Sequence, residues 1–256
     1  MDHRFASGRF TLAAHLARPP KRSSSGPRLP AVVICHGFPA GGQGAEASAG
    51  TLPELADRIA NELGFLAMTF TFRGAGKSEG DFSLHGWLDD ITAAVDHVNT
   101  SESVSGLWLA GFGTGGALCV CAAARDDRIV GVAALGAPAD FDDWAGQPRR
   151  LLQHARDIGL ISDPSFPQFF ERWARALREI RAVQCVARLP PRPLLVVHGT
   201  EDDAVPDFDA RVVADAHGSA ELRLLSGAGH RLRHDPRAVA VLLGWLDRQR
   251  HRRLVP

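Results

Sequence analysis

The sequence of 256 residues predicts an α/β fold, a mostly parallel twisted sheet flanked by helices. Three observations predict it. Short apolar runs alternate along the chain with longer segments of helical period. The composition, 45% hydrophobic and 23% charged, is close to that of an average globular protein. No internal repeat and no long low-complexity segment interrupts the alternation. We therefore expect a single domain over residues 1–256.

Each predicted strand is a short run rich in Val, Leu or Ile. The runs are residues 31–35, 66–72, 107–110, 129–135, 194–198 and 221–225. Ahead of them, Phe10, Leu12 and Ala14 share one face of an expected antiparallel edge strand within the first twenty residues. The proline- and serine-rich segment 19–30 is expected to be a flexible connection from that strand into the sheet.

Apolar residues at helical spacing predict the crossover helices between these strands. The first has Leu52, Leu55, Ile59 and Leu63, and the second has Leu84, Leu88, Ile91, Val95 and Val98. Asp235 and Pro236 supply an N-cap and a first-turn proline for a closing helix. Residues 140–189 contain no convincing strand, and we interpret them as a short helical cap insertion. Their aromatic side chains can line a substrate pocket or simply pack together.

Four motifs follow predicted strands, at the edge where open parallel sheets place their ligands. They are His-Gly-Phe-Pro at 36–39, Gly-Phe-Gly-Thr-Gly-Gly at 111–116, residues 198–206, and Gly-Ala-Gly-His at 227–230. In the first, Gly37 allows a sharp turn that leaves the Phe38 N–H pointing above the sheet, although a simple loop is an alternative. Of three adjacent acids in the third, the offset from Gly199 favours Asp202. The fourth presents the imidazole of His230.

These motifs, together with residues 72–80, make the sequence resemble an α/β-hydrolase of the small esterase and aminopeptidase-like kind across essentially its full length. The resemblance implies the α/β-hydrolase fold and ancestral hydrolysis of a small ester or amide. It implies Asp202 as the acid that orients His230, and His230 as the general base. It implies the backbone N–H groups of Phe38 and Thr114 as the oxyanion hole.

The nucleophile elbow departs from the family pattern. Its sequence G-x-S-x-G is matched at Gly111 and Gly115, but Gly113 stands where the serine belongs. Because glycine has no side chain, covalent catalysis through Gly113 is impossible, and we expect strongly impaired or no covalent hydrolysis. Glycine also relieves the strained backbone of such a turn.

Several alternatives to a serine nucleophile stay open. The Thr114 hydroxyl, the thiols of Cys119 and Cys121, or a water activated by His230 can take its place. The chain can also be a pseudoenzyme, that is, a non-catalytic binding or scaffold protein for a small acyl or aromatic ligand. A third possibility is a deliberate nucleophile knock-out of an active esterase.

Composition excludes several other classes. Twenty-nine basic and 29 acidic residues give no net charge, which argues against a nucleic-acid partner. No apolar run is long enough to span a membrane and no leader pattern opens the chain, so the expected location is cytoplasmic. We expect neither a metal at His230 and His234, which lack a third ligand, nor a cofactor. Residues 74–78 end like a phosphate-binding loop but lack its leading glycine, because Thr71 stands there. The oligomeric state is not predicted.

Overall fold

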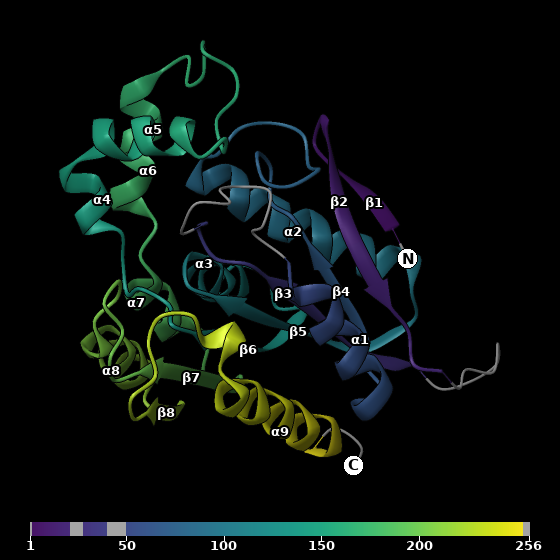
Figure 1. Cartoon of the computed structure of the whole chain (residues 1–256). Coiled ribbons are helices and arrows are strands. Elements are labelled where there is room, and N and C mark those ends of the chain that lie inside the picture. Colours follow the sequence, from purple (N-terminus) through teal and green to yellow (C-terminus); the bar gives the residue numbers. More distant parts are fainter. Residues whose placement is uncertain (1, 21–27, 40–49, 253–256) are drawn as a thin grey trace.

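A computed structural model describes residues 2–20, 28–39 and 50–252, and within them one eight-stranded sheet has the order β1-β2-β4-β3-β5-β6-β7-β8 (Figure 1). The strands are β1 (Asp2–Ser7), β2 (Phe10–Ala17), β3 (Leu29–Cys35), β4 (Leu66–Phe70), β5 (Val104–Phe112), β6 (Ile129–Leu135), β7 (Leu194–Gly199) and β8 (Glu221–Leu225). Strands β4, β3, β5, β6, β7 and β8 pair in parallel, whereas β2 runs antiparallel to both of its neighbours. The predicted α/β class with a mostly parallel sheet is therefore confirmed.

The amino-terminal edge differs from the prediction of a single strand. A turn at Gly8 and Arg9 folds the first residues into the hairpin β1–β2, in which Ser7 pairs with Phe10. The two strands share one buried face, which includes Phe5 and Leu12. Strand β3 begins at Leu29 and so takes up the end of the segment predicted to be flexible. Residues 21–27 of that segment lie outside the described residues.

Helices cover both faces of the sheet. On one face lie α1 (Leu52–Leu63) and α9 (Pro236–Arg252), and on the other α2 (Leu84–Ser101), α3 (Thr114–Ala123) and α8 (Asp207–His217). Successive strand side chains alternate between these layers, so that Val32 and Ile34 join the first while Val33 and Cys35 join the second. Figure 1 shows both layers beside the sheet.

The chain between β6 and β7 is helical throughout its regular structure. It forms α4 (Asp142–Gly146), α5 (Pro148–Asp157), α6 (Phe170–Glu179), α7 (Ala182–Cys185) and the 3₁₀ turn η2 (Val186–Arg188). Helices α4, α5 and α6 stand together at one end of the molecule (Figure 1). They are tied to the loop before α2, because Trp173 Nε1 donates to the carbonyl of Phe82 at 3.0 Å and Phe82 N donates to the carbonyl of Leu160 at 3.0 Å.

A buried ion pair fixes the loop between β4 and α2. Asp90, which is fully buried, accepts hydrogen bonds from the backbone N, Nε and Nη2 of Arg73 at 2.9, 3.0 and 2.7 Å. Ser7 of β1 donates to the same carboxylate at 2.7 Å. The buried carboxylate is thus fully hydrogen-bonded, as burial of a charge requires. The loop with the phosphate-binding-like residues 74–78 is held against the hairpin in this way.

No helix in the described part of the chain combines the length and the apolar character that a membrane crossing needs.

Candidate active site

Four loops meet at the carboxyl edge of the sheet. They follow β3, β5, β7 and β8 and carry Phe38, Gly113, Asp202 and His230, respectively. The first two loops touch directly: the Cβ that a side chain at Gly113 would have lies 3.7 Å from the Cα of Gly37. Parallel strands all end at this edge, so residues far apart in the sequence become neighbours here.

The turn from β5 into α3 is tight at Gly113. Its backbone has φ +52° and ψ −127°, a conformation that L side chains rarely adopt. Its N–H donates to the carbonyl of Leu135 at 2.8 Å, and its own carbonyl accepts from Gly116 N at 2.9 Å. Close approach explains a second glycine, because a Cβ on Gly115 would lie 2.2 Å from the carbonyl oxygen of His36. The backbone thus turns sharply directly beneath the loop that follows β3.

The imidazole of His230 lies over Gly113. A Cβ on Gly113 would be 3.5 Å from His230 Nε2 and 3.8 Å from its Cε1, which are ordinary van der Waals distances. A hydroxyl on that carbon would come within hydrogen-bond reach of Nε2. The space next to Gly113 is therefore compatible with a small side chain that faces the ring.

The other ring nitrogen of His230 contacts Asp202. Nδ1 lies 2.9 Å from Oδ2 and 3.1 Å from Oδ1 of that carboxylate. Because a carboxylate only accepts, Nδ1 carries a proton, and in the neutral ring the lone pair lies on Nε2, the nitrogen nearer to Gly113. Asp202 is fully buried, whereas His230 is partly exposed. The pair has the tautomer and the orientation that a general base needs.

The carboxylate of Asp202 is held ionised. Burial alone would raise its pKa, but hydrogen bonds from His198, His230 and the backbone N–H groups of Val205 and Ala204 outweigh burial and hold the pKa well below its ordinary value. Both amides donate to Oδ1 at 2.9 Å. Asp202 is therefore negatively charged wherever the protein is folded near neutral pH.

His198, the next-to-last residue of β7, opens the third sequence motif, but the sequence did not predict its contact with Asp202. Its buried Nε2 lies 3.2 Å from Asp202 Oδ2 and 2.9 Å from the carbonyl of Val205. Burial lowers the pKa of His198, but the hydrogen bonds to Asp202 and Val205 outweigh burial and raise it. The available signal was a polar residue at the end of an otherwise apolar strand. His198 thus fixes the loop of residues 200–206 through its contacts with Asp202 and Val205.

His36 fixes the loop that follows β3. Its ring is completely buried, with Nδ1 2.7 Å from the carbonyl of Gly37, while Nε2 accepts from the backbone N–H of Phe72 at 3.0 Å. Burial lowers the pKa of His36 to about 4, so the ring is neutral at pH 7. A neutral ring is required, because Nε2 serves as an acceptor.

The amides of Phe38 and Thr114 lie on the two adjoining turns. Thr114 is the first residue of α3, so its N–H precedes the first hydrogen bond inside the helix. Within residues 28–39 and 50–252, no backbone carbonyl accepts the N–H of Phe38. Both donors are thus available to an oxygen atom bound at the edge of the sheet.

The ring of Phe38 packs into an aromatic cluster. Ring centroids lie 4.9 Å away for Trp144 of α4, 5.1 Å for Phe82 and 6.0 Å for His154 of α5. Phe38 and Trp144 are only partly buried. The helices between β6 and β7 therefore reach the active-site edge through this cluster.

The two cysteine side chains of α3 are buried in the core. Cys119 and Cys121 are buried, and the pKa of each is raised well above its ordinary value, for Cys119 chiefly by burial and for Cys121 chiefly by a hydrogen bond with Cys185. Both thiols are protonated and shielded, which disfavours them as nucleophiles. No group of three His, Cys, Asp or Glu side chains suited to a metal occurs among residues that the structure describes.

Comparison with known proteins adds independent observations. The model of the Alpha/beta hydrolase family matches residues 32–242. The uncharacterised protein YfhR of Escherichia coli K12 is 29% identical over 147 residues, 57% of this chain and 45% of YfhR. The chain thus spans less than half the length of this curated relative.

Solved structures share the fold over the whole chain. Est1E of Butyrivibrio proteoclasticus with bound ferulic acid has a TM-score of 0.75 at 22% identity, covering 99% of this chain and 100% of Est1E. An alpha-beta serine hydrolase homologue from Coxiella burnetii has a TM-score of 0.62 at 22% identity, covering 97% and 96%. The predicted α/β-hydrolase fold is confirmed, and with the family match over most of its length the chain belongs to the alpha/beta hydrolase family.

Proposed function

We propose that this chain carries the acid, base and oxyanion-hole groups of a serine hydrolase for a small ester or amide, with Gly113 at the nucleophile position. Asp202 orients His230, His230 acts as the base, and the amides of Phe38 and Thr114 bind the developing oxyanion. The observation that carries the proposal is the 3.5 Å separation between His230 Nε2 and the Cβ position of Gly113. A serine hydroxyl there would face the lone pair of the base.

Without that hydroxyl, covalent hydrolysis by this chain is strongly impaired. Removing the nucleophile of a comparable triad costs about a million-fold in turnover, and the oxyanion hole and binding together leave about a thousand-fold over water. The slow remaining route has His230 Nε2 accept a proton from a water that attacks the carbonyl, with charge building up at the amides of Phe38 and Thr114. The proposal therefore assigns this chain a much reduced hydrolase activity.

A second candidate function is binding without turnover. The partly buried rings of Phe38 and Trp144 lie 4.9 Å apart, centroid to centroid, beside the proposed oxyanion hole. An aromatic or acyl ligand can contact such a surface by stacking. Est1E, which shares the fold, is seen with ferulic acid. On this view the chain is a pseudoenzyme over one domain, residues 1–256, and residues 140–189 are the cap that selects the ligand.

The test introduces the missing hydroxyl. We expect Gly113→Ser to hydrolyse p-nitrophenyl acetate at least about a hundredfold faster than the unaltered chain, given the million-fold contribution of a nucleophile to a complete triad. Gly113→Ala is the matched control, because it adds the same Cβ without the oxygen. Combining Gly113→Ser with His230→Asn should abolish the gain.

Two results would contradict the proposal. A Gly113→Ser protein that is folded by circular dichroism but inert would remove the roles assigned to Asp202 and His230. A fluorophosphonate probe should leave the unaltered chain unlabelled, so labelling at Thr114 would identify that hydroxyl as the nucleophile instead.

A further inference from the structure

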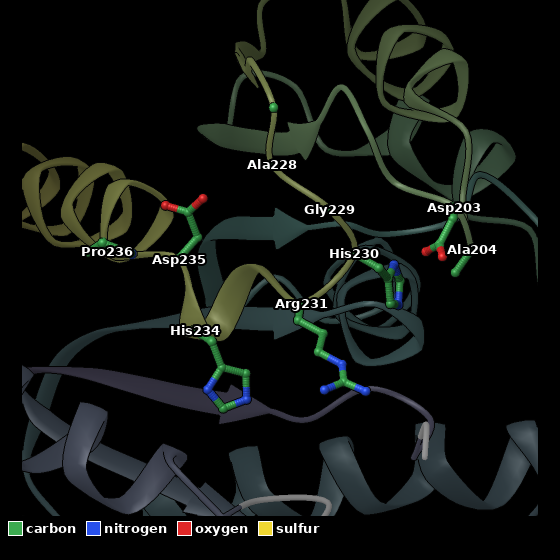
Figure 2. A pocket seen from close by; sticks show the side chains of 10 residues that line it. Asp203, Ala204, Ala228, Gly229, His230, Arg231, His234, Asp235 and Pro236 are labelled. Carbon is green, nitrogen blue, oxygen red and sulfur yellow. The ribbon is translucent and has the colours of Figure 1, made fainter.

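A concave pocket opens beside His230. Its volume is about 660 Å³, and Figure 2 shows the segments that line it: residues 203–204 after β7, residues 227–231 after β8, and residues 234–236 at the start of α9. This volume suits a small ligand. The pocket therefore places further side chains next to the base of the proposed active site.

Three basic side chains gather on the turn that follows His230. They are Arg231, Arg233 and His234, and the 3₁₀ turn η3 (Leu232–His234) holds them together. Leu232 is buried, and its N–H donates to the carbonyl of His230 at 2.8 Å. The N–H of His234 donates to the carbonyl of Arg231 at 3.0 Å. The backbone of the turn is thus anchored, which keeps the Cα atoms of these three residues close together.

The acidic side chains of the pocket do not neutralise Arg231. Asp235 pairs with Arg237 at 2.7 Å, and Asp203 comes from the loop after β7 (Figure 2). Within the described part of the chain no carboxylate lies within 4.0 Å of the Arg231 guanidinium. Arg231 is exposed at the pocket and keeps its hydrogen-bond donors for a ligand.

The positive charges of Arg231 and Arg233 lower the pKa values of neighbouring basic groups. Burial and the charge of Arg231 both lower the pKa of Arg233. The pKa of His234 is lowered by burial and by the charges of Arg233 and Arg231. The charge of Arg233 also acts to lower the pKa of His36, beneath the loop of Phe38.

Hydrogen-bond geometry makes His234 a second donor. Its Nε2 accepts from Arg233 Nε at 3.0 Å, so its ring proton is on Nδ1. The side chains of Arg231 and His234 extend from the turn to the same side (Figure 2). The guanidinium of Arg231 presents paired N–H groups that match the two oxygens of a carboxylate.

We propose that Arg231 and His234 form a subsite for a carboxylate group of the ligand, so that the preferred substrate is a small ester that also bears a free carboxylate. The subsite rests on the proposed function for its link to hydrolysis. Because His230 lines the same pocket, a carboxylate bound there holds the remainder of the molecule next to the base.

The first experiment uses Gly113→Ser and two esters that differ by one charge. We compare kcat/KM for mono-p-nitrophenyl succinate with that for its neutral methyl ester. Charge-assisted hydrogen bonds predict a preference of about tenfold or more for the acid. Adding Arg231→Gln should reduce this ratio about tenfold. Adding Arg211→Gln, which removes an exposed cation of α8 that pairs with Asp207, should leave the ratio unchanged.

A second experiment needs no turnover. Benzoate and benzamide are titrated against the unaltered chain, followed by ligand-detected NMR. We expect benzoate to bind more tightly, and Arg231→Gln to weaken benzoate at least about fivefold relative to benzamide. Benzoate binding that depends on Arg231, together with an inert Gly113→Ser, would support the carboxylate subsite and refute the hydrolase site. An active Gly113→Ser with an ester ratio and a benzoate affinity insensitive to Arg231→Gln would refute the subsite alone.

Discussion

The backbone at Gly113 predicts a measurable loss of stability when a side chain is added. In Gly113→Ala the new Cβ meets its nearest neighbours, the ring of His230 and Gly37, at 3.5 Å or more, so no steric clash contributes. The cost comes from φ +52°, about 1–3 kcal/mol for a residue with a Cβ. Alanine also lowers the conformational entropy of the unfolded chain relative to glycine, which stabilises the folded protein and offsets about 0.4–1 kcal/mol of this cost. Taking values near the middle of each range, we expect a net destabilisation of about 1–2 kcal/mol.

Differential scanning calorimetry measures this loss. At about 2–4 °C per kcal/mol for a domain of this size, Tm should fall by about 2–8 °C. Gly218→Ala is the matched control for strain, because Gly218 has φ +79° and no other group within 4 Å of its Cβ position. Gly146→Ala is the control for Cβ addition, since Gly146 is equally open without positive φ. A Gly113→Ala protein as stable as the unaltered chain would refute the elbow conformation.

Two further predictions concern titrating groups. The pKa of His36 is about 4 in the folded protein, against an ordinary value of 6.5. Between these two pH values the unfolded chain binds more protons than the folded one. The free energy of unfolding therefore falls as the pH decreases through this window, by about 3 kcal/mol at pH 4. Urea unfolding should show this pH-dependent loss in the unaltered chain and not in His36→Gln; equal losses would contradict the buried neutral ring. The second prediction concerns Cys185, whose pKa is lowered to about 7. The main cause is a hydrogen bond from Cys121. The charges of Arg125 and Arg188 lower the pKa further, whereas burial raises it. Iodoacetamide should therefore label Cys185 half-maximally near pH 7 in the folded protein, as read by mass spectrometry, and labelling of buried Cys119 first would contradict the packing.

The regular part of the fold could be predicted from the sequence because its signals are local. The runs 129–135 and 221–225 agree residue for residue with β6 and β8. Strand β6 is buried and needs apolar side chains on both faces, so its run stands out, whereas the edge strand β8 is marked by its three leucines. In the closing helix, Asp235 accepts from Arg237 N at 2.8 Å, as an N-cap does.

Other features depend on contacts that no local pattern carries. The β1–β2 hairpin was missed because its turn at Gly8 and Arg9 is short and the strand before it has few apolar residues. The contact of His198 with Asp202 depends on how the loop after β7 folds back. The packing of Phe38 on Trp144 depends on where the helical segment comes to lie.

The candidate site lies between these extremes. Its loops could be placed by topology, because every parallel strand ends at the same edge. Among the three adjacent acids after β7, Asp202 is the one that contacts His230, at 2.9 Å. The chemistry at Gly113 cannot be derived from topology, because it depends on which atoms a ligand brings to the space beside His230.

Phe38 belongs to two parts of the molecule at once. Its backbone stands at the edge of the sheet, while its ring is wedged among Trp144, Phe82 and His154. The packing of Trp144 and His154 on this ring joins the helical segment between β6 and β7 to the loop that follows β3. Substitution of Trp144 by a smaller side chain would therefore remove packing from the loop that carries Phe38 as well as from the helical segment itself.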